Sequence, residues 1–593
     1  MTVSSSSPAT DLDPFAALKR TVLETVRAQQ AGGRLPDDLP LMRIGVEPPR
    51  DPAHGDAACN IAMVLAKPAG RKPMELAETF ADALRALDHV ERVDIARPGF
   101  INIRFADGAW QRQVVSILLA GESYGASDLG AGERVNVEFC SANPTGPLHV
   151  GHVRGTIFGD VTANLLAFTG HEVCKEYYIN DAGAQIDQLA RSLHLRYREA
   201  LGEAIDAIPE GLYPGAYLKP VGKALAERDG DLWLNLPESE WLGPLRAFAT
   251  DAMLALIKDD LAAVGVHHDV FTSEAGLVRA GAVQAVVDEL QRRDLVYTGT
   301  LPPPKGKPVE DWEPTPQLLF RASEYGDDID RPLKRSNGAW TYFASDTAYH
   351  LDKINRGYRR MIDVLGADHG GYVKRMRAFV RAISDGEAEL QAPLCQLVHL
   401  MDAGQPLKMS KRAGRIVTLR DVVDEVGKDV VRFIMLTRKN DAPLEFDFTK
   451  VTEQSRENPV FYVQYAHARI ASVFRNAAEL GMAAPSPDEA QSLVQALMAP
   501  PELDVMRQLG AWPRTVETAA LQQEPHRIAF YLYELAGVFH ALWNHGKDNP
   551  SLRFLRDDDP SLSRARLALL LATQTVLATG LRLLGVTPVD ELH

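Results

Sequence analysis

Residues 135–181 read VNVEFCSANPTGPLHVGHVRGTIFGDVTANLLAFTGHEVCKEYYIND. The alternating VNVEF predicts a strand, the pattern from His149 to Gly170 predicts a helix, and HEVCKEYYIND predicts a second strand. This order favours a parallel sheet with a right-handed crossover. Strand-like RMIDVLGAD and LCQLVHLM continue this sheet after residue 360, and the long Pro-rich interval before them fits insertions. We therefore expect a Rossmann-like parallel-sheet core over residues 130–451, with insertions.

Different patterns flank this core on its two sides. Residues 1–118 combine helical periodicity, as in PMELAETFADALRAL, with the alternating VERVDIARPGFINIRF, which predicts a small α+β domain. The Gly- and Ser-rich GESYGASDLGAGER follows as a linker. From about residue 452 strand signals vanish, and long amphipathic segments predict an all-α bundle over residues 452–593. The expected fold class is therefore multidomain α/β.

Length and composition fit a multidomain protein of the cytoplasm. The 593 residues exceed what one core supports, and 46% of them are hydrophobic. Cys59, Cys140, Cys174 and Cys395 have neither zinc-ligand nor redox-pair spacing. The chain begins without signal-peptide features, and its longest apolar run, residues 567–581, is too short to span a membrane. The net charge of −15 weighs against a nucleic-acid partner, although binding depends on local patches.

Two histidines, His149 and His152, stand at the start of the expected helix. They allow a metal site, a packing arrangement or a nucleotide cradle. A metal site lacks an evident third ligand, so we expect none. A helix start in a βα turn offers unpaired backbone N–H groups and a positive dipole end to phosphates. Gly151, Gly155 and Gly159 share one helical face, where another group can approach the backbone. This stretch alone leaves packing and phosphate binding open.

A second motif favours the nucleotide. The segment PLKMSKRAGRIVTLRDVV places Lys408, Lys411 and Arg412 close together. A charge cluster alone is usually solvated surface. Cleavage of ATP between its α- and β-phosphates, however, leaves negative charge on pyrophosphate, which mobile lysines can neutralise in the transition state. We therefore expect Lys408 and Lys411 to bind ATP phosphates.

Together the two motifs resemble the signatures of class I aminoacyl-tRNA synthetases, since HVGH (149–152) is similar to HIGH and KMSKR (408–412) to KMSKS. Longer strings resemble arginyl-tRNA synthetases, over essentially the whole chain: VEFCSANPTGPLHVGH, YYINDAGAQI, WTYFASDTAYHLDK, GADHGGYVKR and NPVFYVQYAHARI. One departure is valine for isoleucine in HVGH. The resemblance implies ATP-dependent ligation of L-arginine to its tRNA through an arginyl-adenylate, with Mg²⁺ and with release of pyrophosphate and AMP.

The resemblance also implies which residues act on ATP. The catalytic residues would be His149, His152, Lys408 and Lys411. The ATP site would contain the same four residues together with Gly151, Met409 and Ser410.

Recognition of arginine requires carboxylates in bidentate geometry and an aromatic face, at strand ends beside the phosphate site. Glu138 ends the strand before HVGH, and Tyr342 and Asp346 are four residues apart in TYFASD. The resemblance implies that these three surround arginine, that Asn143 holds its backbone end, and that His369 lies near a further contact. The residues alone also allow a structural ion pair at Glu138, a core aromatic at Tyr342 and a turn former at Asn143. Three polar residues either support the substrate or the tRNA end or cap a helix: Asn180, Asp181 and Gln185.

The flanking domains are expected to bind tRNA. The resemblance implies that residues 452–593 bind the anticodon and residues 1–118 the tRNA elbow. Tyr462, Gln464 and Arg469 offer the stacking and hydrogen-bonding groups that single-stranded RNA needs, although Tyr462 is equally suited to the core. The expected partners are tRNA(Arg), L-arginine and ATP, for a monomer without membrane contact. The resemblance further implies that arginine activation waits for tRNA.

Two rival functions stay open from the sequence. The first is another class I synthetase or a small nucleotidyltransferase, although the latter does not explain a helical C-terminal third. The second is a catalytically silent tRNA-binding paralogue, against which the lysines of KMSKR speak.

Overall fold

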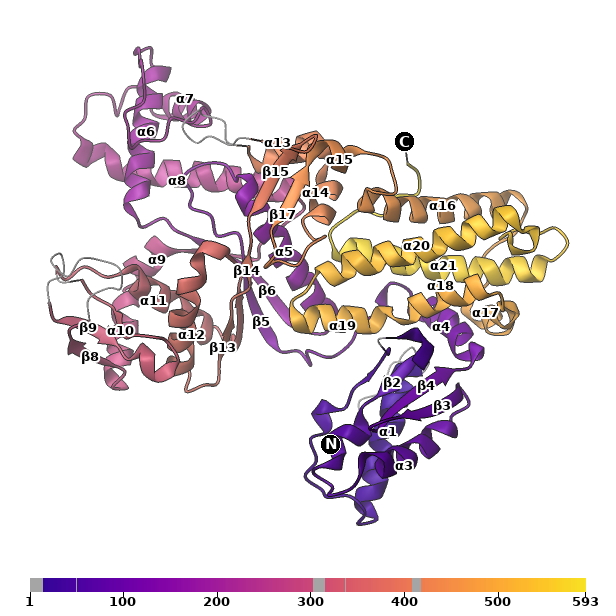
Figure 1. Ribbon diagram of the computed structural model, residues 1–593. Coiled ribbons are helices and arrows are strands. Elements are labelled where there is room, and N and C mark those ends of the chain that lie inside the picture. The colour runs from indigo at the N-terminus through magenta and orange to yellow at the C-terminus, as the bar shows by residue number, and fades with distance from the viewer. Residues whose placement is uncertain (1–13, 50, 302–314, 336, 408–416, 593) are drawn as a thin grey trace.

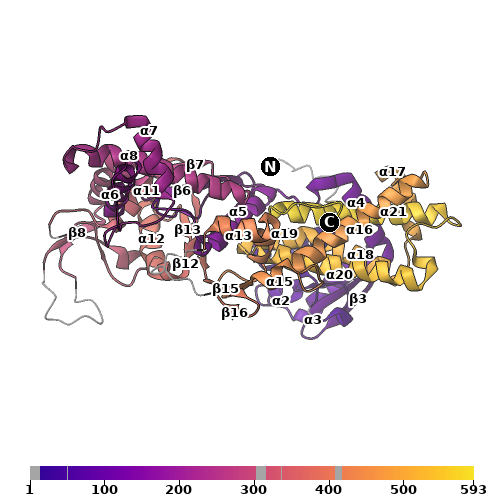
Figure 2. The same cartoon turned by 90° about the horizontal axis from the view of Figure 1, so that it is seen from above.

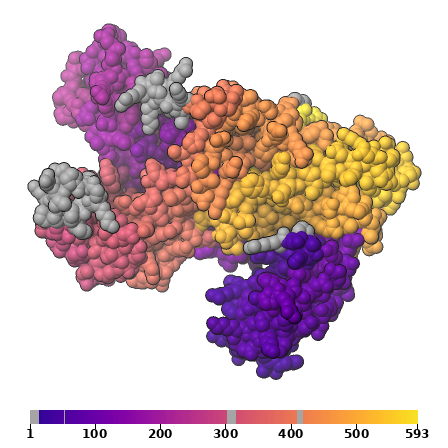
Figure 3. Space-filling view, in the orientation of Figure 1, coloured from indigo at the N-terminus to yellow at the C-terminus, as the bar shows by residue number. Residues whose placement is uncertain are grey.

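The computed structural model describes residues 14–49, 51–301, 315–335, 337–407 and 417–592. It contains an N-terminal α+β domain, a parallel-sheet core with two inserted lobes, and a C-terminal helical bundle (Figure 1). The bundle adjoins the core, whereas the N-terminal domain stands out from the body below both (Figure 3). The expected multidomain α/β fold class is confirmed.

The N-terminal domain is a four-stranded antiparallel sheet, in the order β1-β2-β4-β3, with helices beside it. The segment VERVDIARPGFINIRF forms β3 and β4, as its alternation predicts. In α3 the buried Leu76, Phe80 and Leu84 recur every four residues and give the helix one apolar face. The elements are α1 (Pro14–Ala31), β1 (Val46–Glu47), β2 (Ala57–Cys59), α2 (Ile61–Ala66), α3 (Pro73–Arg85), β3 (Val90–Ala96) and β4 (Phe100–Phe105).

Helix α4 (Asp107–Ala120) and the linker after it join this domain to the C-terminal helices. Gln111 Nε2 donates to the Leu497 carbonyl at 3.1 Å. Trp512 Nε1 donates to the Tyr124 carbonyl at 2.9 Å. The first domain is therefore attached to the bundle by buried hydrogen bonds of α4 and the linker.

The core is a five-stranded parallel sheet in the order β13-β11-β5-β6-β7. Helix α5 (Val150–Phe168) connects β5 to β6, as the βαβ pattern predicts. The strands are β13 (Glu389–Gln391), β11 (Arg360–Asp363), β5 (Arg134–Glu138), β6 (Glu172–Ile179) and β7 (Val270–Ser273). The central β5 is buried from Val135 to Glu138 because helices cover both faces of such a sheet.

One expected strand lies elsewhere. RMIDVLGAD supplies β11 to the sheet, but LCQLVHLM does not continue it. Its first part, β14 (Leu394–Cys395), pairs with β12 (Leu365–Gly366). Its second part, β15 (Val398–Asp402), lies between β16 (Gln405–Pro406) and β17 (Leu444–Asp447) in a three-stranded sheet. Strand periodicity indicates an extended segment but does not select its partner.

Two lobes are inserted into the core, on the left of Figure 1. The first has its own apolar core and contains α6 (Ala184–Ala200), α7 (Leu218–Asp229) and α8 (Glu238–Ala263). The second contains α9 (Glu274–Arg279), α10 (Ala282–Arg292), β8 (Val296–Gly299), β9 (Gln317–Phe320), β10 (Arg331–Pro332) and α11 (Tyr342–Asn355). It packs against α12 (Gly370–Ile383), which connects β11 to β13 of the core sheet.

The C-terminal bundle stacks long helices beside the core (Figure 2). It is preceded by α13 (Leu419–Val426), α14 (Lys428–Ile434) and α15 (Phe448–Thr452). Its helices are α16 (Pro459–Glu479), α17 (Pro487–Leu493), α18 (Pro500–Gly510), α19 (Trp512–Gln522), α20 (His526–Asp548) and α21 (Pro560–Leu583). The apolar run 567–581 lies inside α21 and is largely buried. Among the described residues, no helix is long and apolar enough to cross a membrane.

Candidate active site

Two carboxylates lie side by side at the carboxyl end of the central sheet. Glu138, the last residue of β5, is the register partner of Asp363, the last residue of β11. The ammonium of Lys353 from α11 donates to Glu138 Oε2 at 2.6 Å and to Asp363 Oδ1 at 3.0 Å. Burial disfavours this ammonium, yet the charges of Asp363 and Glu138 outweigh burial and raise the pKa of Lys353. Glu138 therefore has the structural ion pair that the sequence allowed, and this leaves its role toward arginine a prediction.

The chain turns sharply directly after β5. Cys140 and Ser141 have φ angles of 71° and 36°, in the left-handed region that residues with a Cβ rarely adopt. Ser141 Oγ donates to Glu138 Oε1 at 3.0 Å and accepts the Tyr178 N–H at 3.1 Å. These contacts fix the start of the loop that leads to HVGH.

The two histidines of HVGH cap α5. His149 Nδ1 accepts the N–H of Gly151 at 3.1 Å, and His152 Nδ1 accepts the N–H of His149 at 3.3 Å. The ring centroids are 3.7 Å apart. Because Nδ1 of each ring accepts a hydrogen bond, the neutral ring carries its proton on Nε2, where it can be donated to a phosphate oxygen.

The backbone N–H groups at this helix start are already engaged, contrary to our expectation of an open anion seat. The N–H of Val150 donates to the Val417 carbonyl at 3.2 Å, and the N–H of His152 donates to the His149 carbonyl at 2.8 Å. Those of His149 and Gly151 bond the imidazoles. Phosphates at this site would therefore meet imidazole N–H groups rather than backbone N–H groups.

The lysine motif lies outside the described residues, and with it the predicted Lys408, Met409, Ser410 and Lys411. The residues that flank it are described. On one side, the Leu407 N–H donates to the Leu400 carbonyl at 2.9 Å. On the other side, Thr418 forms an antiparallel bridge with His149, and the Leu419 N–H donates to the Leu148 carbonyl at 2.7 Å. The chain therefore leaves this segment directly beside HVGH.

Two further carboxylates near the sheet edge, those of Asp346 and Glu274, have raised pKa values, although the charges of His350 and Arg375 oppose the shift at Asp346. Desolvation raises the pKa of Asp346 to about 7; the His350 ring opposes this shift, and the charges of Glu274 and Glu138 add to it. Desolvation also raises the pKa of Glu274, the first residue of α9. Within the described ranges, the Asp346 carboxylate has no hydrogen bond or ion pair, although it stays partly exposed. Such groups are suited to a cationic ligand, which would relieve their mutual repulsion.

The other predicted arginine ligands, Asn143, Tyr342 and His369, are exposed at the surface. Asn143 is exposed, and its Nδ2 donates to Gln185 Oε1 at 2.9 Å. Tyr342 begins α11 one turn before Asp346 and is 73% exposed, so it is not a core aromatic. His369 follows β12 and is exposed.

Asp181, which the sequence left open, caps the start of α9. Its carboxylate accepts Ser273 Oγ at 2.6 Å and the Ala275 N–H at 2.7 Å. The capping alternative applies here, although the capped segment is distant in sequence.

The glycines of α5 differ in how much space a Cβ would have. A Cβ on Gly159 would lie 2.3 Å from the Phe139 ring, so this glycine lets α5 approach the end of β5. A Cβ on Gly155 would lie 3.9 Å from Val364, an ordinary contact. At Gly159 the packing interpretation is therefore correct.

Sequence reasoning missed Glu274 and Lys353. Glu274 directly follows β7, so an acid just past a strand was the available signal. Lys353 lies seven residues after Asp346 on the same helix and therefore on a similar face, but a buried lysine has no sequence signature.

The predicted RNA contacts of α16 divide into internal and surface groups. Tyr462 packs against Tyr533 and His540, with ring centroids 5.0 and 4.6 Å away. Gln464 Nε2 donates to the Thr587 carbonyl at 3.0 Å. Arg469 lies over the exposed Tyr465 ring, 4.1 Å from its centroid, and helps to line an open groove of about 570 Å³.

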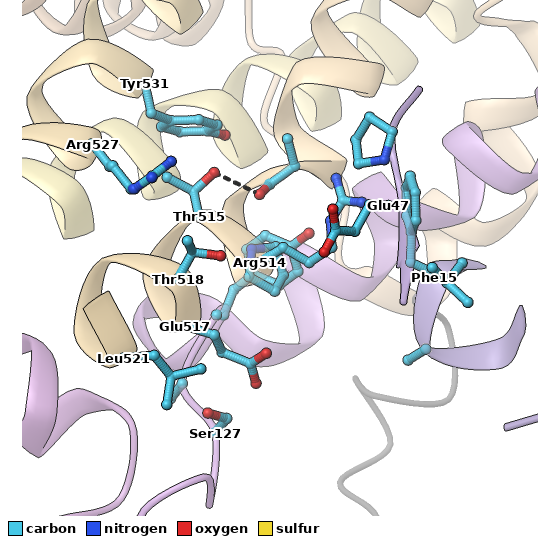
Figure 4. A pocket seen from close by; sticks show the side chains of 18 of the residues that line it. Phe15, Glu47, Ser127, Arg514, Thr515, Glu517, Thr518, Leu521, Arg527 and Tyr531 are labelled. Carbon is cyan, nitrogen blue, oxygen red and sulfur yellow. Dashed lines mark hydrogen bonds between the residues drawn. The ribbon is translucent and has the colours of Figure 1, made fainter. Parts of the chain in front are cut away.

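A cleft of about 1470 Å³ lies between the N-terminal domain and the C-terminal bundle (Figure 4). The Arg514 guanidinium lies 3.5 Å from the centroid of the Phe15 ring, across the two parts. None of the acidic residues or histidines of the candidate site lines this cleft. Its location is a seam between domains, away from the sheet edge.

Comparison with known proteins gives a consistent result along the chain. Residues 16–105 match the family model "Arginyl tRNA synthetase N terminal domain", and residues 113–210 match "tRNA synthetases class I (R), catalytic domain". Residues 463–592 match "DALR anticodon binding domain". A protein named "Arginine--tRNA ligase" from Ruegeria pomeroyi is 57% identical over 584 residues, covering 98% of this chain and 100% of that protein. One of the same name from Parvibaculum lavamentivorans is 57% identical over 580 residues, with the same coverage.

Solved structures agree in fold. The Thermus thermophilus arginyl-tRNA synthetase aligns with a TM-score of 0.72 at 22% identity, covering 98% of this chain and 100% of that chain. The Plasmodium falciparum arginyl-tRNA synthetase aligns with a TM-score of 0.70 at 15% identity, covering 98% and 99%.

Proposed function

This chain belongs to the arginyl-tRNA synthetase family, and we propose that it performs the ligation at the carboxyl edge of β5 and β11, beside HVGH. It is a class I aminoacyl-tRNA synthetase with arginine–tRNA ligase activity. One observation supports this location most strongly: Asp346, whose pKa is raised by burial and by the charges of Glu274 and Glu138, lies on the helix whose Lys353 bonds Glu138 and Asp363 at the sheet edge.

The guanidinium of arginine binds between Asp346 and Glu274. A cation there would favour the ionised form of Asp346, which burial and the charges of Glu274 and Glu138 disfavour. Glu138, held by Lys353, adds negative potential from the sheet edge. Asn143 binds the amino-acid end, Tyr342 covers the side chain from the start of α11, and His369 approaches from the loop after β12.

ATP binds over the start of α5. The Nε2–H groups of His149 and His152 donate to its phosphates, with Gly151 between them. Lys408, Met409, Ser410 and Lys411 are proposed to complete the site from the segment that ends beside His149. Mg²⁺ is proposed to arrive with ATP as part of the substrate.

The reaction follows in two steps. A carboxylate oxygen of arginine attacks the α-phosphorus in line, and pyrophosphate leaves. A hydroxyl of the terminal ribose of tRNA then attacks the arginyl carbonyl, and AMP leaves. As in other class I synthetases, this is proposed to be the 2′-hydroxyl. No side chain forms a covalent bond, since positioning and charge stabilisation supply the catalysis.

The flanking parts bind tRNA(Arg). Residues 452–593 bind the anticodon, with Arg469 and Tyr465 at the groove and Tyr462 and Gln464 shaping α16 behind it. Residues 1–118 bind the tRNA elbow, and residues 130–451 form the catalytic domain. We propose that the protein works as a monomer in the cytoplasm.

Pyrophosphate exchange tests this assignment. Exchange of labelled pyrophosphate into ATP would be measured with each of the twenty amino acids, with and without tRNA. The assignment requires exchange with arginine alone among them. Exchange with a different amino acid would indicate another class I synthetase, and none under any condition would indicate a silent tRNA-binding paralogue.

A further inference from the structure

Lys353 joins two elements that carry opposite ends of the proposed arginine site. It projects from α11 and is fully buried, with 0% of its side chain exposed. Its ammonium bonds Glu138 of β5 and Asp363 of β11 at 2.6 and 3.0 Å. The Tyr349 ring, one turn earlier in α11, lies 4.4 Å from the same ammonium. The buried charges of Lys353, Glu138 and Asp363 are therefore paired with one another, and such a satisfied buried network holds α11 in one position relative to β5 and β11.

On the helix side, this contact determines where Asp346 lies. Asp346 and Lys353 are seven residues apart in α11, two turns on a similar face. His350, between them, donates from Nδ1 to the Asp346 carbonyl at 2.8 Å, and its Nε2 lies 2.8 Å from Asp363 Oδ2. A shift of α11 along the sheet would therefore carry Asp346 with it.

On the sheet side, the same contact determines where the β5–α5 loop starts. The Glu138 oxygen that Lys353 does not bind accepts Ser141 Oγ at 3.0 Å. Ser141 belongs to the strained turn at φ 36°, two residues before Asn143. A left-handed turn at a residue with a Cβ persists only where surrounding contacts hold it.

We propose that Lys353 is a positioning residue that fixes the distance between Asn143 and Asp346, and thereby the side-chain length of the amino acid accepted. It does not touch the substrate. It acts through Glu138 and Ser141 on one side and through α11 on the other. The inference rests on the proposed function, in which Asn143 and Asp346 bind opposite ends of arginine.

Homoarginine, which is one methylene longer than arginine, is the probe for this spacing. Lys353→Met keeps the stem and removes the charge. Since one methylene in a closed pocket is worth about tenfold or more in specificity, we expect the homoarginine-to-arginine ratio of kcat/KM to rise about tenfold in pyrophosphate exchange. Asp363→Asn removes one of the two anchors and should move the ratio in the same direction by less. This second variant keeps the test available if Lys353→Met does not fold.

Arg432→Met is the matched control. Arg432 is also fully buried and bonds a carboxylate, Asp160, but it lies between α14 and α5 rather than between α11 and β5. It should lower the melting temperature and leave the homoarginine-to-arginine ratio unchanged. Lys353→Arg, which retains a cation, should keep the ratio closer to that of the parent than Lys353→Met does.

The possible results distinguish a spacing role of Lys353 from a purely structural one and test the proposed arginine ligands. If Lys353→Met lowers activity with arginine and homoarginine equally, the lysine stabilises the fold and does not set the spacing, and the inference is overturned. If Asn143→Ala and Asp346→Ala leave arginine use unchanged, the proposed ligands are wrong, and the inference falls with the proposed function whatever Lys353→Met does.

Discussion

Thr418 forms an antiparallel bridge with His149, so the residue that caps α5 lies against the residue that caps α13. In a capping box, Thr418 Oγ1 accepts the N–H of Asp421, and the Thr418 N–H donates to the Asp421 carboxylate. Residues 408–416 end directly before this contact. The described residue Thr418, two positions after this segment, therefore lies against His149.

Lys411→Ala tests whether that segment serves the chemical step. Charge on pyrophosphate grows mainly in the transition state, so the activation rate should fall by about 10²–10³-fold while the ATP dissociation constant changes little. Single-turnover exchange and ATP binding measured separately give the two quantities. Lys223→Ala, an exposed lysine of α7, serves as the control. If Lys411→Ala weakens ATP binding but leaves the activation rate normal, the proposed role of Lys411 in the transition state is wrong.

Asp346→Asn tests the guanidinium site. The substitution keeps the shape and removes the charge, and the loss of a charge-assisted pair costs about 1.5–3 kcal/mol. The kcat/KM for arginine should therefore fall about tenfold to a hundredfold, while ATP binding holds. Asp352→Asn lies on the same helix, where Asp352 pairs with Arg356, and should leave arginine use unchanged. Equal losses in both variants would argue against a specific role.

The raised pKa of Asp346 predicts a pH dependence. Its value of about 7 lies above the ordinary aspartate value, so the carboxyl is ionised above pH 7 and protonated below. Arginine is a cation throughout this range and needs the ionised form. The KM for arginine should be flat above pH 7 and rise as the pH falls, by about tenfold per unit at most. The slope should diminish in Asp346→Asn. An unchanged profile in that variant would assign the titration to another group.

The raised pKa of Asp346 also predicts that its ionised carboxylate, which favours arginine binding, lowers the stability of the free folded protein. A carboxyl whose folded pKa is raised destabilises the folded state most above that pKa. The penalty begins to shrink as the pH falls below about 7 and is gone only below the ordinary aspartate pKa. Asp346→Asn should therefore raise the melting temperature at pH 8 and do so less at pH 5.5. Thermal unfolding of the free protein at both pH values measures this. A lower melting temperature at pH 8 would mean that the charge has a stabilising partner.

The sequence predicts most where signals are local. The segment from Val135 to Asp181 carries its strand and helix periods, and it forms β5, α5 and β6 as expected. The pairing of LCQLVHLM was not predictable, because β15 finds β17 more than forty residues later. Glu274 and Lys353 belong to α9 and α11, which follow long insertions, and Lys353 is fully buried. The position of Glu274 just past β7 was a weak local signal, whereas only the fold reveals that Lys353 contacts Glu138.

Two glycines of α5 provide a test of packing. Gly159→Ala places a Cβ 2.3 Å from the Phe139 ring and should lower the free energy of unfolding by about 1–3 kcal/mol. Gly155→Ala meets its nearest atom at 3.9 Å and should be neutral or stabilising, because alanine is the better helix former by about 1 kcal/mol. Chemical denaturation of both variants measures the two changes in the free energy of unfolding. If both are tolerated equally, the contact between α5 and Phe139 does not require glycine.

The last prediction concerns the order of events. The catalytic helix α5 is bonded to the C-terminal bundle at its far end: Asn164 Nδ2 donates to the Leu583 carbonyl at 3.1 Å, and Arg432 joins Asp160 to the Leu584 carbonyl. tRNA bound to the bundle therefore acts on an element whose other end is HVGH. If the tRNA-bound conformation is the one that binds ATP productively, tRNA shifts the population toward it. We expect arginine-dependent pyrophosphate exchange to need tRNA.

The free enzyme would then bind arginine and ATP without reacting, which protects the adenylate from hydrolysis. The measurement is pyrophosphate exchange after nuclease treatment, with tRNA added back. A tRNA whose terminal ribose is oxidised cannot accept arginine, so it separates occupancy from transfer. Restored exchange with the oxidised tRNA would mean that binding alone organises the site, whereas exchange only with intact tRNA would make the terminal ribose part of it. Brisk exchange with RNA rigorously removed would contradict tRNA dependence while leaving the arginine assignment in place. Asn164→Ala, which removes the bond to Leu583, should then lower the response to tRNA more than the affinity for arginine.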